Sequence, residues 1–340
     1  DLILLNVLDN ARIHAFSDGH RGEIRIAATP AANDRIHISV SDNGVGIAAD
    51  HLPRIFDPFF TTRLGHGGSG LGLSIVYRLV TQTLGGRIRV SSQEGRGTMF
   101  VLEIPAVAPA DPAEGYRVQF ALHGLLAPRL GPRVGWKIGA TTRVMQEWLA
   151  IDHPCGGGVL ESGLRPDGGS FVAAQCIQPM VETEIVARLS ADLPSRPGGH
   201  DRQSVAAAVA SLHPGIELVD DRYDGFAAVG VPALIGDDFF QAGAVIGPAA
   251  PDWRALDLPA LRGRVTISGT ARGEGVGAAM MGHPLAALAW LASTLNAAGT
   301  ALRAGDFVFL GSVVAPQPVA AGDRVEVAFD GLGRVGVSFA

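Results

Sequence analysis

Three glutamates in the second half of the chain have the type and spacing of ligands for a hard divalent cation. Glu182 and Glu184 stand two residues apart, and Glu217 follows in the segment Pro-Gly-Ile-Glu-Leu-Val-Asp. On a strand, side chains at i and i+2 point to the same face, so the first two carboxylates repel each other unless a cation joins them. Mg²⁺ and Mn²⁺ prefer such oxygen ligands. A Glu-x-Glu pair is also typical of a solvated strand face, and both interpretations stay open at this point.

A glycine-rich pattern near the start of the chain indicates nucleotide chemistry. Asp42 ends a predicted strand, where a carboxylate can accept the exocyclic amine of adenine. Glycines after it let the backbone approach a base, and a second glycine run precedes a predicted helix, whose first N–H groups favour phosphate oxygens. Turns alone explain most glycine strings, so the order of the motifs has to decide. The candidate nucleotide-binding residues are Asn10 (as a Mg²⁺ ligand), Asp42, Gly44, Gly46, Gly68, Gly70 and Gly72.

The elements expected around the glycine pattern form a small α+β sandwich. Apolar spacing predicts a helix over residues 2–16, and a second helix over 74–84 is closed by two glycines. Alternating residues predict four strands, at 24–28, 35–41, 87–91 and 98–104. We therefore expect a first domain over residues 1–105. An Ala/Pro-rich linker follows over residues 106–113.

The rest of the chain, residues 114–340, is expected to form one mostly β domain of roll or barrel type. Helices are predicted over 113–127 and over 284–296, the latter with Pro at its first turn. Asp330-Gly331 predicts a hairpin between the last two strands. The predicted strands are 171–177, 180–189, 264–268, 307–310, 324–329 and 334–339.

Composition narrows the possible partners. The 340 residues are 47% hydrophobic and carry a net charge of −6, so no general affinity for nucleic acid or anionic membranes is expected. No apolar run approaches the roughly 18 residues of a membrane span, so none is expected. Two cysteines without metal-site spacing favour a reducing, cytoplasmic setting. The chain begins without Met and without a basic leader segment. We therefore expect the chain to be a piece of a longer gene product.

Four motifs in order resemble the ATP-binding domain of sensor histidine kinases, the GHKL ATPase class. Residues 5–11, 42–47, 55–62 and 67–74 match that family's N box, first glycine box, F box and second glycine box. The resemblance implies a Bergerat-type fold, truncated at its start, that binds ATP with Mg²⁺ through Asn10 and Asp42 under a lid at 68–72. The family's upstream phosphoacceptor hairpin is missing, and His14 is expected at the surface or near the nucleotide. We therefore expect nucleotide binding without autophosphorylation in this chain.

A second series of motifs resembles the fumarylacetoacetate hydrolase superfamily, closest to its 2-keto-4-pentenoate hydratase and 2-oxo-acid decarboxylase branch. The series covers residues 135–146, 179–185, 216–223, 282–291, 302–306 and 321–323. It implies a β-roll domain, a Mg²⁺ or Mn²⁺ site on Glu182, Glu184 and Glu217, and Lys137 near the substrate. Because relatives commonly self-associate, a homo-oligomer is expected by resemblance.

The residue types fit chemistry on a small 2-oxo acid. Such an acid chelates a cation, which acts as a Lewis acid toward the enolate. Lys137, with its pKa lowered by the cation, would shuttle a proton, although a structural ion pair is the alternative. The predicted catalytic residues are Lys137, Glu217 and Asp220, and the predicted substrate-binding residues are Arg143 and Asp237. An exposed surface role is the alternative for Arg143.

Two further positions qualify this prediction. His283 precedes a proline at a helix start and is expected to cap that helix. Asp237-Asp-Phe-Phe240 stands where many relatives have Asp-Asn-Ala-Ser, so two phenylalanines would make the pocket more apolar or fill it.

The sequence thus predicts a divalent-metal-dependent hydratase or decarboxylase of a 2-oxo or 2-hydroxy-dienoic acid in aromatic-compound degradation, fused to an ATP-binding module. The alternatives are a sensor histidine kinase fragment with a passenger domain, and a joined gene in which neither activity is intact.

Overall fold

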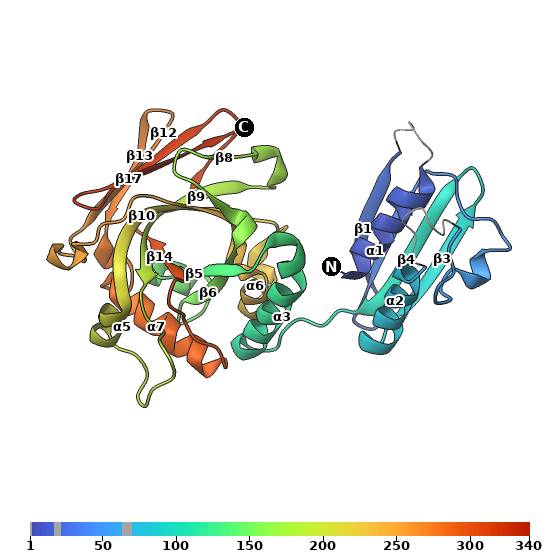
Figure 1. Ribbon diagram of the computed structural model, residues 1–340, viewed down its shortest axis with the longest axis horizontal. Coiled ribbons are helices and arrows are strands. Elements are labelled where there is room, and N and C mark those ends of the chain that lie inside the picture. Colours follow the sequence, from blue (N-terminus) through green and yellow to red (C-terminus); the bar gives the residue numbers. More distant parts are fainter. Residues whose placement is uncertain (1, 17–21, 63–69) are drawn as a thin grey trace. The chain divides into compact units, whose positions relative to one another are not determined.

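The computed structural model describes residues 2–16, 22–62 and 70–340. The chain divides into two compact units, Asp1–Ala108 and Pro109–Ala340, here called the N-terminal and C-terminal units (Figure 1). Both combine helices with sheets, as the predicted α+β class requires.

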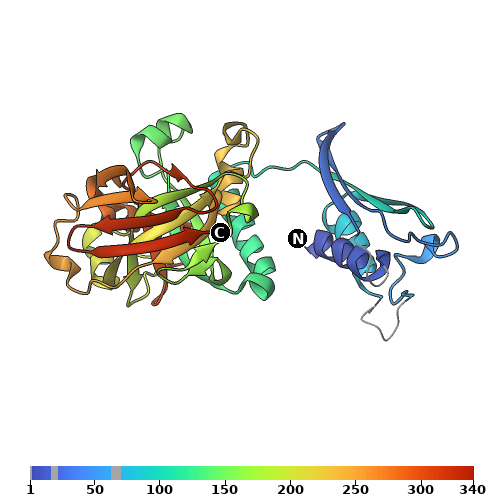
Figure 2. The same cartoon turned by 90° about the horizontal axis from the view of Figure 1, so that it is seen from above.

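The N-terminal unit is a four-stranded antiparallel sheet covered by helices. The strand order is β1-β2-β4-β3, and Figure 2 shows both main helices on the same face of the sheet. Val7, Val76 and Phe100 are fully buried between the two layers. The elements are α1 (Leu2–Asn10) with its continuation Ala11–Ala15, β1 (Ile24–Ala31), β2 (Arg35–Asp42), the turn Leu52–Arg54, α2 (Gly72–Arg78) with its continuation Leu79–Thr83, β3 (Arg87–Gln93) and β4 (Gly97–Pro105).

The C-terminal unit is built on two β-sheets. The larger has the order β6-β5-β14-β9-β10-β11-β7, with β15 beside β9. Because β6 and β11 contact each other, this sheet curls toward closure, as Figure 1 shows. Its strands are β5 (Arg133–Gly139), β6 (Cys155–Leu160), β7 (Leu164–Arg165), β9 (Pro179–Leu189), β10 (Val209–Asp220), β11 (Gln241–Ile246), β14 (Phe307–Ser312) and β15 (Gln317–Pro318).

The smaller sheet and the helices cover the larger sheet. The smaller sheet has the order β13-β12-β16-β17-β8. Its strands are β8 (Ser170–Phe171), β12 (Arg262–Ile267), β13 (Thr270–Val276), β16 (Arg324–Phe329) and β17 (Gly333–Phe339). The helices are α3 (Pro112–Leu130), α4 (Arg143–Trp148), α5 (Arg202–Ala208), α6 (Val231–Gly236) and α7 (Pro284–Ala297). Short 3₁₀ turns lie at Glu161–Gly163, Ala173–Gln175, Phe226–Ala228, Asp238–Phe240, Trp253–Ala255 and Gly277–Ala279.

Helix α7 is the apolar centre of this unit. Leu288, Leu291 and Leu295 are fully buried in the main core. His283 caps the helix, since its Nδ1 accepts the N–H of Leu285 at 3.0 Å, which confirms the predicted cap. Contrary to the sequence expectation, the segment Gly277–Ala297 is long and apolar enough to cross a membrane by length and composition. Its burial in the core explains that apolarity.

Several strands differ from the sequence prediction. The strand expected at 171–177 ends at Phe171, and a 3₁₀ turn follows at Ala173–Gln175. Strands β5, β6, β10 and β11 were not predicted, yet they are four of the eight strands of the larger sheet. The hairpin at Asp330-Gly331 is confirmed, since β16 and β17 pair in antiparallel register around it.

Candidate functional site

Two neighbouring strands bring the three glutamates together. Glu182 and Glu184 lie on the same face of β9, as their spacing predicts. In the antiparallel register of β9 with β10, Glu217 stands directly opposite Glu182. One carboxylate oxygen from each of the three lies within 4.8 Å of the others. We call this group the carboxylate cluster.

Burial makes the carboxylate cluster electrostatically costly. Glu184 and Glu217 are fully buried, and Glu182 is half-buried. Burial, together with the charges of Glu217 and Glu182, raises the pKa of Glu184 well above its ordinary range. Burial likewise raises the pKa of Glu217 to about 7, against the opposing pull of Lys137. Three carboxylates in this position need a compensating positive charge.

The main chain holds one of these carboxylates in place. The N–H of Gly311, at the end of β14, donates a hydrogen bond to Oε2 of Glu184 at 2.8 Å. Gly311 has φ +115°, and a Cβ there would lie 2.4 Å from Oγ1 of Thr141, so a side chain is excluded. Gly311 could not be predicted as a site residue, because a lone glycine after an apolar run carries no specific signal.

Three oxygens of the carboxylate cluster are buried without a hydrogen-bond partner among the described residues, Oε1 of Glu184 and both oxygens of Glu217. Of these, Oε1 of Glu217 has the ion-pair contact with Nζ of Lys137 at 3.2 Å. An unsatisfied buried carboxylate oxygen is costly, and coordination of a hard cation would satisfy it. The donor set therefore fits Mg²⁺ or Mn²⁺, the ions predicted from the sequence.

Lys137 extends from β5 into the same cluster. Its side chain is 2% exposed, and its Nζ lies 3.2 Å from Oε1 of Glu217. Burial lowers the pKa of Lys137, but Glu217, Glu182 and Glu184 together outweigh burial and raise it. The sequence expectation of a lowered pKa depended on a bound cation. The carboxylates alone act in the opposite direction.

The remaining predicted site residues lie in different surroundings. Asp220, buried at the end of β10, accepts the N–H groups of Ile177 and Gln178 at 2.9 and 2.7 Å, so it fixes the loop before β9. Asp237 forms an ion pair with Arg222 at 2.7 Å. The side chain of Arg143 is 88% exposed and pairs with Glu147 on α4. The structure does not bring Asp220, Asp237 or Arg143 into the carboxylate cluster.

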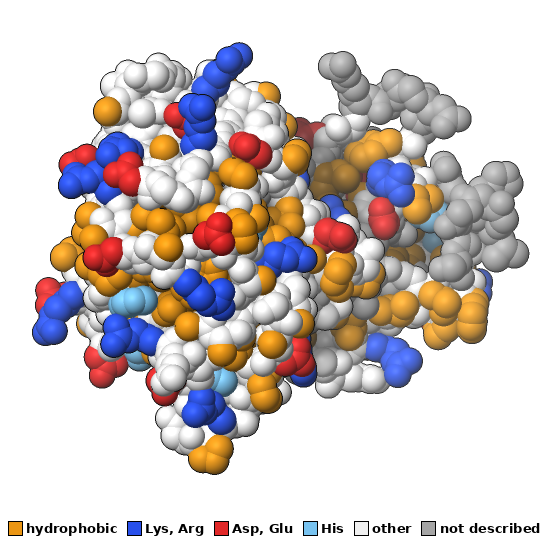
Figure 3. Space-filling view, turned by 60° about the vertical axis from the view of Figure 1, so that its left-hand side comes forward, with side chains coloured by type: hydrophobic (Ala, Val, Ile, Leu, Met, Phe, Trp, Pro, Cys, Tyr) orange, Lys and Arg blue, Asp and Glu red, His pale blue; other side chains and the backbone are white. Residues whose placement is uncertain are grey.

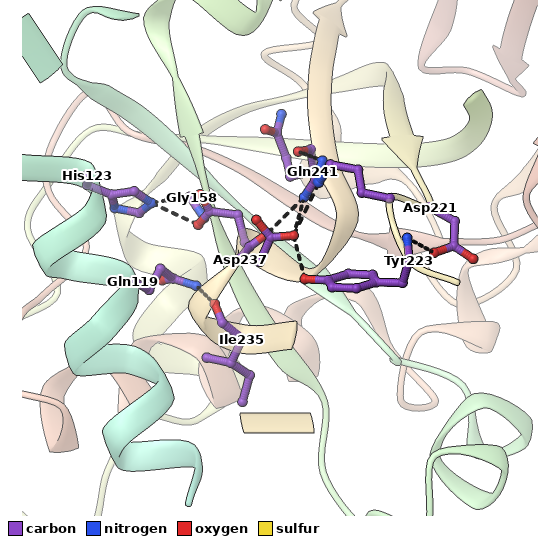
Figure 4. Close-up of polar contacts among 10 residues, drawn as sticks. Gln119, His123, Gly158, Asp221, Tyr223, Ile235, Asp237 and Gln241 are labelled. Atoms are coloured by element: carbon purple, nitrogen blue, oxygen red, sulfur yellow. Dashed lines mark hydrogen bonds and ion pairs between the residues drawn. The ribbon is translucent and has the colours of Figure 1, made fainter. Parts of the chain in front are cut away.

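The segment after α6 joins this region to helix α3. His123 on α3 contacts the carboxylate of Asp238 at 2.8 Å, and the same carboxylate accepts the N–H of Gly158 at 2.7 Å. The hydroxyl of Tyr223 donates to Asp237 at 2.7 Å. Figure 4 shows these contacts converging on the segment from both sides.

One face of the molecule can be inspected for its charge. On the face shown in Figure 3, Lys and Arg side chains are interspersed with Asp and Glu among the described residues, and no broad area of one sign is visible. This face offers no extended basic surface for nucleic acid.

The N-terminal unit holds a separate cavity of about 490 Å³. Asn10 lines it from the end of α1, and Gly46, Gly70 and Gly72 line it from the two glycine-rich segments. His14 lines it too, in agreement with the nucleotide-proximal alternative. The predicted Gly68 lies outside the described residues.

Asp42 and Gly44 shape the loop beside this cavity. Oδ1 of Asp42 accepts the N–H groups of Gly44 and Thr98 at 2.9 and 3.3 Å, which orients the carboxylate. A Cβ on Gly44 would lie 2.2 Å from the carbonyl oxygen of Ala15, so this glycine lets the loop pack against the first helix. The absence of a side chain at Gly44 therefore serves packing of the loop against the protein's own backbone, and the predicted contact with a base stays a prediction.

Comparison with known families separates the two units. Residues 160–339 match the family model described as fumarylacetoacetate (FAA) hydrolase C-terminal. Residues 1–108 match the model described as histidine kinase-, DNA gyrase B-, and HSP90-like ATPase. The chain is also 44% identical over 106 residues to the sensor histidine kinase ZraS of Salmonella typhimurium, a match that spans 31% of this chain and 22% of that kinase.

The chain is also similar to individual proteins over a length close to that of its C-terminal unit. The chain is 36% identical over 223 residues to a 2-hydroxyhexa-2,4-dienoate hydratase of Comamonas testosteroni, covering 64% of this chain and 83% of that protein. A solved structure of 4-oxalocrotonate decarboxylase from Pseudomonas putida G7, complexed with magnesium and adipate, is 31% identical with a TM-score of 0.64. That match covers 68% of this chain and 86% of the solved one.

Proposed function

Because the chain belongs to the fumarylacetoacetate hydrolase family, we propose that its C-terminal unit is a divalent-cation-dependent lyase. It hydrates a 2-hydroxy-dienoic acid or decarboxylates a related 2-oxo acid. Similarity to a hydratase and to a decarboxylase supports both reactions. The proposal places this reaction in the degradation of aromatic compounds.

The observation that carries the proposal is the buried carboxylate cluster of Glu182, Glu184 and Glu217 with Lys137 beside it. Three buried oxygens without a hydrogen-bond partner among the described residues, and the mutual repulsion of three carboxylates, support a resident Mg²⁺ or Mn²⁺. Such an ion would supply Lewis-acid polarisation of a 2-oxo acid's neighbouring oxygens.

The protein groups have distinct roles in this mechanism. Glu184 is fixed by Gly311, so its second oxygen keeps a constant orientation. Lys137 holds its proton firmly among the carboxylates and lies 3.2 Å from Glu217. It is therefore positioned to give that proton to a substrate carbon, while Glu217 would hold the cation and keep Nζ of Lys137 in place. Asp220 acts indirectly, by holding the loop before β9.

The N-terminal unit supports a second function, binding of ATP with Mg²⁺. The cavity of about 490 Å³ lined by Asn10 and the glycine segments favours this function. Its similarity to a sensor histidine kinase makes signalling the alternative for this unit.

The proposal includes a cytoplasmic location and self-association. Both cysteines are free, and Cys155 is buried, which suits a reducing compartment. The expectation of a homo-oligomer rests on resemblance to relatives.

The direct test is the ultraviolet absorbance of 2-hydroxypenta-2,4-dienoate mixed with the purified chain and Mg²⁺, with and without EDTA. We expect loss of the dienoate chromophore that stops in EDTA and returns with excess Mg²⁺, with 4-hydroxy-2-oxopentanoate as product. Loss of the chromophore at the same rate in EDTA would disprove cation dependence. A folded chain that binds Mg²⁺ but turns over neither this dienoate, nor 2-hydroxyhexa-2,4-dienoate with its methyl tail, nor 4-oxalocrotonate would disprove the lyase assignment.

A further inference from the structure

A row of four aromatic rings leads from Lys137 to the protein surface. Nζ of Lys137 lies 5.1 Å from the ring centroid of Phe239. From there, successive centroids are 5.2 Å apart to Phe240, 5.1 Å to Phe226 and 4.7 Å to Trp148. Phe239 is 3% exposed and Trp148 is 59% exposed, so this aromatic row runs from a buried ring beside Lys137 to a ring at the surface.

The backbone under the inner end of the row is held in an unusual conformation. Asp238, Phe239 and Phe240 all have positive φ, at 57°, 50° and 69°. This conformation is sterically unfavourable for a residue with a Cβ, and such strain concentrates at functional sites. The buried carboxylate of Asp238, bonded to His123 and to the N–H of Gly158, holds the segment against that cost.

Neighbouring glycines make space for the segment. A Cβ on Gly139 would lie 2.3 Å from Cδ1 of Phe239, and one on Gly157 would lie 2.3 Å from the carbonyl oxygen of Asp238. The ring of Phe239 is thus seated directly on the strand that carries Lys137, so it occupies the immediate surroundings of the proposed reaction centre.

Four basic side chains near the row are each in contact with a carboxylate. Arg222 is bound by Asp237, and Arg143 is bound by Glu147 on α4. His123 contacts Asp238, and Lys137 itself contacts Glu217. A carboxylate at the far end of a substrate would meet aromatic rings and would compete with the carboxylates that already contact these four groups, so its desolvation would be poorly compensated.

We propose that the aromatic row is the binding wall for the distal end of the substrate, and that this end is an uncharged apolar chain. The substrate class is then a monocarboxylic 2-hydroxy-dienoic or 2-oxo acid with an alkyl or aryl tail, in preference to a dicarboxylic acid. This inference rests on the proposed function, since it assumes that the 2-oxo acid group binds at the carboxylate cluster.

The test is equilibrium binding of unreactive 2-oxo acids in Mg²⁺ by calorimetry, which does not depend on turnover. Each buried methylene contributes about 0.8 kcal/mol, so 2-oxohexanoate should bind about tenfold more tightly than 2-oxobutanoate. 2-Oxoadipate, with a terminal carboxylate, should bind at least about tenfold more weakly than 2-oxohexanoate. Equal affinities, a preference for the dicarboxylate, or no binding of any of the three would overturn the inference.

Matched variants show whether the row itself is responsible. Phe240→Leu and Phe226→Leu should reduce the tail preference to about threefold while leaving 2-oxobutanoate affinity within about twofold. Phe307→Leu, a half-buried ring packed on His213 outside the row, is the control and should keep the tenfold ratio. Equal loss in the control and the row variants would assign the effect to general packing and refute the proposal. If the chain does not turn over the dienoate but still prefers 2-oxohexanoate to 2-oxobutanoate, the result would contradict the lyase reaction and leave the role of the aromatic row intact.

Discussion

Replacing Glu184 with Gln should make the cation-free protein more stable while removing the response to Mg²⁺. The cluster oxygens lie no more than 4.8 Å apart. At an effective dielectric constant of about 20, each like-charge pair at that distance costs about 3 kcal/mol. The substitution removes the repulsions with Glu182 and Glu217 and also the attraction to Lys137. The net relief is therefore of the order of one pair, about 3 kcal/mol.

The shape of the side chain is retained in this variant. The amide oxygen of Gln can still accept the N–H of Gly311, and the amide N–H₂ can donate to the carboxylate of Glu217. For a unit the size of residues 109–340, about 3 kcal/mol corresponds to a rise in Tm of roughly 6–12 °C. A ligand present at 100 times its Kd stabilises by about 2.7 kcal/mol, so Mg²⁺ should raise the Tm of the original protein by a similar amount.

The assay is thermal unfolding followed by circular dichroism at pH 7.5, in EDTA and in millimolar Mg²⁺. Glu326→Gln removes an exposed carboxylate on β16 and serves as the control, with a Tm within about 1 °C of the original in both buffers. A Glu184→Gln variant that is less stable than the original in EDTA would refute the electrostatic reasoning. An unchanged Mg²⁺ response would refute the role of Glu184 as a ligand.

Four further outcomes are expected. Burial raises the pKa of Glu217 from 4.5 in the unfolded chain to about 7. In EDTA, its contribution to folding stability is therefore most favourable below pH 4.5, where the carboxyl is protonated in both states. Thermal unfolding at a series of pH values should show a loss of about 3 kcal/mol of stability as the pH rises from 4.5 to 7. Lys137→Met should lower kcat for dienoate hydration at least about 100-fold while leaving Mg²⁺ affinity within a few-fold, measured by absorbance and calorimetry. Asp42→Asn should weaken ATP binding to the N-terminal unit about tenfold or more, and unchanged affinity in a nucleotide titration would contradict the adenine role. His123→Ala leaves Asp238 buried without its partner, so it should destabilise the protein by about 1–3 kcal/mol in urea unfolding; an unchanged midpoint would show that Gly158 alone holds the segment.

The features that could be predicted from the sequence are those whose local residue pattern agrees with their role in the folded structure. The Glu-x-Glu spacing on β9 fixed the face of two carboxylates, because strand periodicity is local. The last hairpin followed from its Asp-Gly turn. In contrast, β6 begins Cys-Gly-Gly-Gly and β10 contains Pro214-Gly215, compositions typical of loops. Their strand conformation depends on neighbours that only the folded chain supplies.

The unpredicted features surround the proposed reaction centre, and one physical cause links them. On β6, a Cβ at Gly158 would lie 2.2 Å from the ring of His123, so the glycines are there to admit α3 and the Asp238 segment. On β10, Glu217 is fully buried, and burial disfavours the ionised form of its carboxyl group. Each feature violates a local rule of strand composition, backbone conformation or charge burial, and each is compensated by a group distant in sequence. Natural chains concentrate such violations where function requires them. The convergence of independent violations around Lys137 and Glu217 is therefore an argument for a reaction centre that does not depend on any single ligand assignment.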